Sequence, residues 1–212
     1  MTSIVQQLIQ QAKRELQALQ ELKTNPKIAV QRFMKNPVTK DYIKSCRMQL
    51  SWHDLCDSKR YVFIAAPRDH GKSVQIVVGR TACKIGNNPN IRIKIISCND
   101  DQALKRSKAI KDIIESNEDF KKIYGELKPS KPTNWTDTRL TVNRPIKGIT
   151  EPTLEAYGIG SSGTGDRADL VVCDDIVSFD NAIKFPAMRE MIKTKFWGDI
   201  MWYMPPKTGE LV

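Results

Sequence analysis

Two kinds of apolar pattern alternate along this chain. Between residues 3 and 23, apolar residues recur every three or four positions, which places them along one face of a helix that Thr24-Asn25-Pro26 ends. A second short helical stretch covers residues 27–35 and ends at Asn36-Pro37. The apolar stripe of the first helix can dock on the domain behind it or on a partner protein, and we favour docking within the chain.

From Tyr61 onward, short apolar runs are separated by helical patterns. The expected strands are 61–66, 91–97, 139–142, 154–159, 170–173 and 210–212, and the expected helices are 73–85, 101–115 and 187–203. The first run, YVFIAA, is typical of a strand that is buried on both faces. Asn99 or Asp100 is a suitable cap for the second of these helices. The alternation predicts an α/β fold in which helices flank a mostly parallel sheet.

Length and composition fit one sizeable α/β domain with a short appended segment. The chain has 212 residues, of which 40% are hydrophobic and 27% charged, so it can bury a core. No apolar run approaches the roughly 20 residues that a membrane span needs, and the first residues lack the pattern of a secretory signal. Five cysteines without C-x-x-C spacing predict reduced, mostly buried thiols. We therefore expect a cytoplasmic protein without a membrane partner.

The net charge of +10 favours a polyanionic partner, with nucleic acid first among them. The lysines are spread along the chain and alternate with acidic residues through 100–131, as they do in many proteins that bind no DNA. Charge alone therefore leaves both interpretations open.

A candidate phosphate-binding loop lies between the expected strand 61–66 and the helix that follows it. A loop in this position points backbone N–H groups and a helix N-terminus at bound phosphates. Lys72 is expected to reach the β- and γ-phosphates of a nucleotide, Ser73 to bind Mg²⁺, and Gly71 to allow close backbone approach. Ala66 stands where the usual G-x-x-x-x-G-K-[ST] pattern has its first glycine. The residues expected to line the nucleotide are Pro67, Arg68, Asp69, His70, Gly71, Lys72 and Ser73.

A pair of carboxylates follows the apolar run 170–173. Strand ends of this kind lie at the edge of an open α/β sheet where ligands bind. We expect Asp174 to hold Mg²⁺, usually through water, and Asp175 to orient or deprotonate the attacking water. A strand that ends in a solvated Asp-Asp turn is the structural alternative.

Two arginines are candidates for stabilising charge in the transition state of phosphoryl transfer. Arg167 lies in a glycine-rich loop just before the acidic strand, and its alternative role is a salt bridge with Asp166 or Asp169. Arg68 lies inside the phosphate loop, four residues before Lys72, and its alternative is packing on the loop surface.

Together, P-R-x-x-G-K-S and a distant T-G-x-R-A-D that precedes four apolar residues and Asp-Asp resemble the ATPase domain of the terminase large subunit of tailed bacteriophages. The resemblance extends from about Gln49 to the C-terminus and implies a P-loop NTPase of the additional-strand (ASCE) type. In this type, at least one strand lies between the phosphate-loop strand and the Asp-Asp strand. The apolar spacing predicts a helical N-terminal segment at 1–45, and the resemblance implies an ATPase domain at 46–212 that stops before the coupling motif and the nuclease domain.

The same resemblance implies roles for individual residues. It assigns Lys72 and Ser73 to phosphate and Mg²⁺, Arg68 to the γ-phosphate, Asp174 to the metal and Asp175 to the catalytic carboxylate. Many relatives have Glu at the position of Asp175. Arg167 is the nearest match to the family's glycine-loop arginine, which some relatives carry three residues earlier, where this chain has Thr164. Gln49 resembles the glutamine that reads adenine, and His53 is an alternative. For each of these two, a packing role is the competing interpretation.

The implied function is Mg²⁺-dependent ATP hydrolysis that drives double-stranded DNA into a capsid. The implied partners are DNA, the portal protein, the small terminase subunit and further copies in a ring, in the host cytoplasm at the procapsid portal. Two alternatives stay open: another helicase-like nucleic-acid translocase, and a nucleotide-dependent DNA-binding scaffold that does not hydrolyse ATP.

Overall fold

A computed structural model of the chain describes residues 2–36, 38–131, 134–161, 163, 165–178 and 180–212. The helices are α1 (Thr2–Thr24), α2 (Pro26–Phe33), α3 (Arg47–Ser58), α4 (Thr81–Asn87), α5 (Asp100–Ser116), α6 (Glu118–Tyr124), α7 (Pro186–Lys195) and α8 (Met201–Tyr203), with π-helical segments η1 (Ser73–Arg80), η2 (Asp180–Lys184) and η3 (Phe196–Ile200). The strands are β1 (Ile93–Ser97), β2 (Arg139–Leu140), β3 (Leu154–Gly158), β4 (Leu170–Asp174) and β5 (Glu210–Leu211).

The strands that the structure describes form one sheet in the order β2-β3-β1-β4-β5. β1 runs parallel to β3 and β4, β5 runs parallel to β4, and only β2 is antiparallel to its neighbour. In register, Ser97 at the end of β1 lies beside Gly158 of β3 and Asp174 of β4. The expectation of a mostly parallel sheet is thus confirmed, and the carboxyl ends of its strands meet at one edge.

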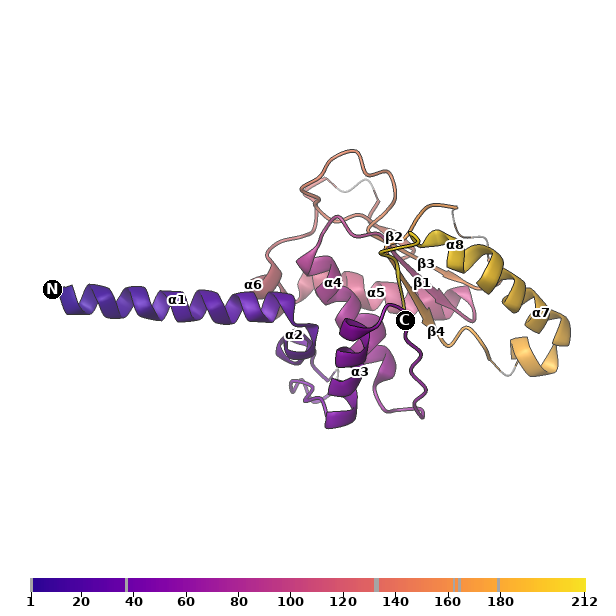
Figure 1. Cartoon of the computed structure of the whole chain (residues 1–212), viewed down its shortest axis with the longest axis horizontal. Coiled ribbons are helices and arrows are strands. Elements are labelled where there is room, and N and C mark those ends of the chain that lie inside the picture. Colours follow the sequence, from indigo (N-terminus) through magenta and orange to yellow (C-terminus); the bar gives the residue numbers. More distant parts are fainter. Residues whose placement is uncertain (1, 37, 132–133, 162, 164, 179) are drawn as a thin grey trace.

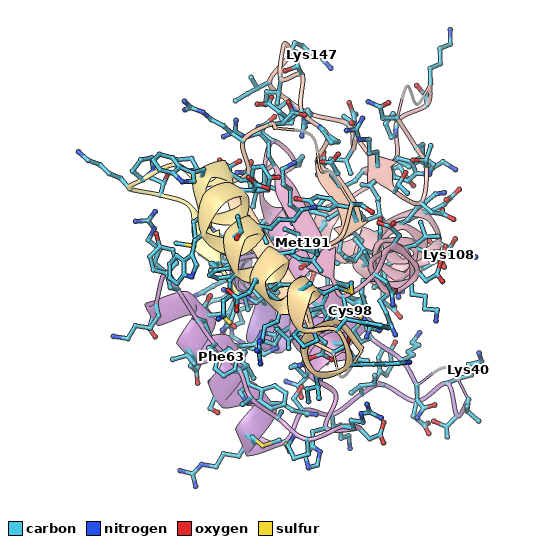
Figure 2. The ribbon with its side chains drawn as sticks, turned by 90° about the vertical axis from the view of Figure 1, so that its right-hand side faces the viewer. Lys40, Phe63, Cys98, Lys108, Lys147 and Met191 are labelled. Carbon is cyan, nitrogen blue, oxygen red and sulfur yellow. The ribbon has the colours of Figure 1, made fainter. Side chains whose placement is uncertain are left out.

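Helices cover both faces of this sheet, as expected (Figure 1). The alternation of side chains along a strand explains why both faces are apolar. In β4, Leu170 and Val172 enter the core beneath α2, α4, α5 and α6, whereas Val171 packs on the other side against the α7–α8 segment. Figure 2 shows this last segment, with Met191, crossing in front of the sheet.

The segment 61–66 does not form the buried strand that its sequence predicts. It is extended but pairs only at its start, where Tyr61 forms a parallel bridge with Leu211 and the Val62 amide donates to the Leu211 carbonyl at 2.9 Å. Phe63 is 89% exposed, so the segment is not buried on both faces. Because Leu211 also pairs with Val171, β5 lies between β4 and the start of this segment.

Helix α1 projects from the body of the molecule (Figure 1). Leu19 and Leu22 pack against the main core, but Ile4, Leu8 and Leu16 are exposed. The expected docking within the chain is therefore seen for Leu19 and Leu22, and it is wrong for the part of the stripe up to Leu16. The contacts of α1 are with α2, α4 and α6, all near its C-terminal end.

Candidate functional site

The loop from Pro67 to Lys72 connects the extended segment 61–66 with η1. Its first four residues are exposed. Asp69 and Gly71 have φ angles of 64° and 76°, in the left-handed region. A Cβ at Gly71 would also lie 2.9 Å from Nε2 of Gln49. The backbone conformation at residue 71 therefore favours glycine, since only glycine adopts such angles without a steric cost.

Gln49 on α3 supports the loop from behind. Its Nε2 donates to the His70 carbonyl at 2.8 Å, and its Oε1 accepts from the Cys46 amide at 2.9 Å, which caps α3. The ring Nδ1 of His70 lies 2.9 Å from the Arg68 carbonyl, a contact within the loop. Both ends of the Gln49 amide are thus engaged by protein groups. Its predicted role in reading adenine stays a prediction.

His53 is not available to a ligand, because it is completely buried. Its Nε2 lies 3.3 Å from Oε1 of Gln75 on η1, so it packs α3 against the helix that follows the loop. Burial, which opposes the charged imidazolium, lowers the pKa of His53. The packing interpretation of this residue is the right one.

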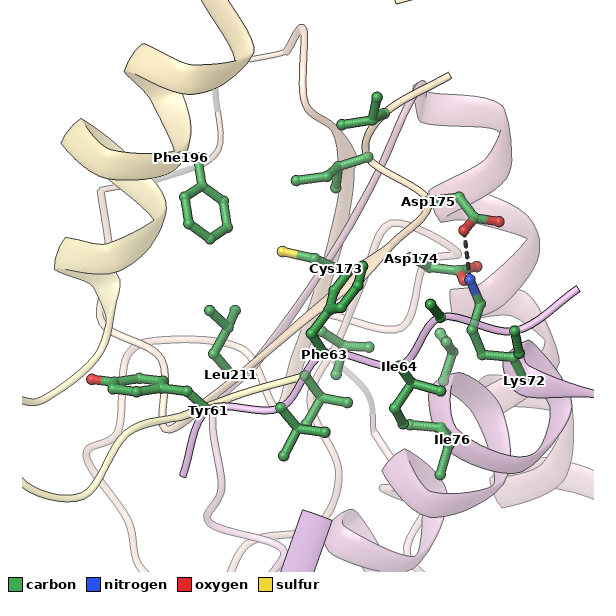
Figure 3. Close-up of a pocket in the computed structure, with 18 residues that line it drawn as sticks. Tyr61, Phe63, Ile64, Lys72, Ile76, Cys173, Asp174, Asp175, Phe196 and Leu211 are labelled. Atoms are coloured by element: carbon green, nitrogen blue, oxygen red, sulfur yellow. Dashed lines mark hydrogen bonds and ion pairs between the residues drawn. The ribbon is translucent and has the colours of Figure 1, made fainter. Parts of the chain in front are cut away.

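The two aspartates meet the loop at the carboxyl edge of the sheet (Figure 3). Lys72 Nζ donates to Asp175 Oδ1 at 2.6 Å, and Ser73 Oγ lies 3.3 and 3.5 Å from the carboxylate oxygens of Asp174. Asp174 ends β4 with its side chain only 2% exposed, whereas Asp175 is exposed and has a φ of 49°. Parallel chain direction explains this meeting, since the loop follows the extended segment 61–66, which bridges parallel to β5, and the aspartates end β4, which also runs parallel to β5.

The donor set of Ser73 and Asp174 suits Mg²⁺, which prefers oxygen ligands. Adjacent ligands around Mg²⁺ lie roughly 2.9 Å apart, given metal–oxygen distances of about 2.0–2.1 Å, so the observed 3.3 Å needs only a small adjustment. Within the part of the chain that the structure describes, no group of three or more His, Cys, Asp or Glu residues could hold a metal. The two residues fit a magnesium ion whose remaining ligands are substrate phosphates and water.

The two predicted arginines are not held at this site. Arg68 and Arg167 are exposed, and no hydrogen bond or ion pair joins either side chain to another residue of the described ranges. Asp169, a possible partner of Arg167, instead binds Arg92 at 2.7 Å. Thr164 lies outside the described residues.

Sequence reasoning missed a third arginine, Arg106 on α5. Its Nε donates to Asp174 Oδ2 at 2.6 Å. The helix carries many basic residues, and only the pairing of β1 with β4 brings this one to the aspartate.

A mostly apolar cavity of 670 Å³ adjoins the polar site (Figure 3). Its walls are the extended segment 61–66 and the residues around the end of β4, with Ile76, Phe196 and Leu211 among the lining side chains. Lys72, Asp174 and Asp175 lie at one end of it. The thiol of Cys173 also faces this cavity, and burial raises its pKa to about 12. All five cysteines are free thiols, as expected.

This architecture is consistent with an α/β NTPase-like fold. No protein-family model matches the chain. Among curated proteins, it is similar to the terminase large subunit of Enterobacteria phage T3, with 31% identity over 120 residues. The match covers 57% of this chain and 19% of the relative, so the chain spans about a fifth of that protein's length. The similarity supports a terminase relationship.

One further finding concerns membranes. In the described ranges, no helix combines the length and the apolar character that a membrane crossing requires.

Proposed function

We propose that this chain hydrolyses ATP with Mg²⁺ to move double-stranded DNA, as the ATPase part of a phage terminase large subunit. One observation carries the proposal: a glycine-containing loop and the helix after it meet two carboxylates at the carboxyl edge of a parallel sheet. Lys72 contacts Asp175 there, and Ser73 contacts Asp174. The similarity to a phage terminase large subunit supports a DNA-packaging role.

The strand arrangement supports a P-loop ATPase of the additional-strand type. In this type a strand separates the phosphate-loop strand from the strand that bears the acidic pair. β5 has this position, because Leu211 bridges to Tyr61 on one side and pairs with Val171 on the other.

The residues of the chain suggest how hydrolysis would proceed. Lys72 leaves Asp175 and contacts the β- and γ-phosphates, which frees Asp175 to orient the attacking water. The water oxygen would bond to the γ-phosphorus while its proton passes to Asp175 and from there to solvent, the bond to the β–γ bridging oxygen would break, and ADP and phosphate would leave. Ser73 and Asp174 would hold Mg²⁺, which neutralises phosphate charge. Arg68 from the loop, and Arg167 in cis or from a neighbouring copy, are the proposed sources of transition-state stabilisation.

The proposed setting is the procapsid portal in the host cytoplasm, with the portal protein, the small terminase subunit and further copies of this chain as partners. Contacts to DNA would be to phosphates, without sequence readout, since a motor must pass every sequence. Stimulation of hydrolysis by duplex DNA should therefore fall steeply as salt rises.

The proposal is tested by steady-state ATP hydrolysis with and without Mg²⁺ and duplex DNA. Activity that requires Mg²⁺, rises with duplex DNA and disappears in Asp175→Asn supports the motor. A non-hydrolysing scaffold would instead show DNA binding that depends on nucleotide and survives Asp175→Asn. Stimulation by single strands alone would favour a helicase-like translocase.

A further inference from the structure

The carboxylate of Asp174 needs a positive partner, because it is almost completely buried. Lys72 is not that partner, since its ammonium group pairs with Asp175. Ser73 offers a neutral hydroxyl at 3.3 Å. The ion pair that the structure shows for Asp174 is with Arg106, whose Nε lies 2.6 Å from Oδ2. A charge-assisted contact of this length is a strong one.

The fold fixes the place from which Arg106 reaches the aspartate. β1 and β4 are in register at Ser97 and Asp174, so the helix that follows β1 starts beside the acidic pair. Two hydrogen bonds fix the first turn of α5. The Asn99 side chain caps the helix by accepting from the Gln102 amide, and the Asp100 carboxylate accepts from the Gly158 amide at 2.7 Å.

Arg106 lies at the border between the buried face and the exposed face of α5. Ala103, Ser107 and Ile110 on that face are completely buried, while the Arg106 side chain is partly exposed. The guanidinium therefore reaches Asp174 from a helix held in place, and it is also accessible from solvent.

We propose that Arg106 is a positioning residue of the nucleotide site that exchanges with the metal. In the nucleotide-free protein it occupies the carboxylate that binds Mg²⁺, and it gives up this contact when the metal and nucleotide bind. The proposal rests on the proposed function, because it assumes that Asp174 is the metal carboxylate.

A direct consequence is competition between two cations for one carboxylate. Before the metal arrives, the Arg106 guanidinium contacts Oδ2 of the buried Asp174 carboxylate, and the metal must displace it. Removal of Arg106 should therefore tighten metal binding and weaken the metal-free fold. A residue with a purely structural role would weaken the fold without tightening metal binding.

The test measures Mn²⁺ binding in the presence of ADP by electron paramagnetic resonance. Arg106→Gln is compared with wild type and with Lys105→Gln, which removes the same charge from the neighbouring, exposed position. We expect Arg106→Gln to bind Mn²⁺ at least about tenfold more tightly, because it removes a positive charge a few ångströms from the metal position, and charges interact more strongly at a partly buried site than in water. Lys105→Gln should stay within about twofold of wild type, as expected for a screened surface charge. Arg106→Lys, which keeps the charge, should restore most of the wild-type value.

A second readout does not depend on metal or nucleotide. In EDTA, Arg106→Gln should unfold at a lower temperature than Lys105→Gln, and in the background of Asp174→Asn this difference should shrink, because the partner charge is gone. Equal or weaker Mn²⁺ binding by Arg106→Gln overturns the exchange while leaving the proposed function intact. Failure of the wild type to bind Mn²⁺ with ADP overturns the proposed function instead, and the exchange with it.

Discussion

Replacement of Gly158 by alanine tests how closely the end of β3 packs against the start of α5. A Cβ at this residue would lie 2.5 Å from the carbonyl carbon of Asn99 and 2.6 Å from the amide nitrogen of Asp100. Both are backbone atoms at the start of α5, so no side chain can rotate away to make room. The start of the helix must shift, and the 2.7 Å hydrogen bond from the Gly158 amide to Asp100 is strained or lost.

The expected cost adds two contributions. Overpacking of a well-packed site costs about 1–3 kcal/mol, and loss of the hydrogen bond costs about 1 kcal/mol. The sum, about 2–4 kcal/mol, corresponds to a fall in Tm of roughly 4–16 °C for a chain of this size. Because α5 carries Arg106, the shift should also loosen the contact with Asp174.

Gly160→Ala is the matched control, since no heavy atom lies within 4 Å of a Cβ built there. Both substitutions reduce the entropy of the unfolded chain by a similar amount, so the difference between them isolates the contact. Thermal unfolding followed by circular dichroism should place Gly158→Ala well below Gly160→Ala. Equal unfolding temperatures would refute the close packing of α5 against the end of β3.

Three further predictions concern the loop, the core and pH. Gly71→Ala should lower Tm by several degrees and weaken nucleotide binding, since a non-glycine residue at this φ costs about 1–2 kcal/mol; wild-type values for both would contradict the account of the loop. Glu155→Gln should cost about 3–5 kcal/mol in urea unfolding, because it removes a charge that Lys94 contacts at 2.5 Å in the buried sheet, and a cost below 1 kcal/mol would argue against this pair. The lowered pKa of His53 means that the unfolded chain binds the proton more readily. Stability should therefore fall as the pH drops below about 6.5, and His53→Gln should flatten this dependence in a series of Tm measurements between pH 5 and 8.

Much of the fold follows from local patterns. The apolar run before Asp174 predicts β4, and Asn99 caps α5 by accepting from the Gln102 amide, as its position suggests. These features are local because strand burial and helix capping depend on a few neighbouring residues. The exposed Phe63 shows the limit of such patterns. An apolar run predicts burial, but the pairing that would bury it extends only to Val62.

The sequence predicts only part of the candidate site. Lys72, Ser73 and the two aspartates stand in runs with a recognisable order, and the structure brings these four residues together. Arg106 has no such signal, because it is one basic residue among several on a polar helix. Its contact depends on the register of β1 with β4, which joins residues 68 positions apart in sequence. The arginines that sequence reasoning chose, such as Arg167, have instead no described partner.

Everything proposed for this protein depends on nucleotide phosphates binding at the loop around Lys72. The most direct test is titration of a fluorescent, non-hydrolysable ATP analogue with Mg²⁺ into wild type, Lys72→Ala and Lys147→Ala. Lys147 is an exposed lysine at the edge of the molecule and serves as the control for lost charge (Figure 2). The account predicts saturable binding by wild type and Lys147→Ala, and at least a tenfold loss in Lys72→Ala, or about 1.4 kcal/mol. Equal binding by all three proteins, or no binding by the wild type, would contradict it.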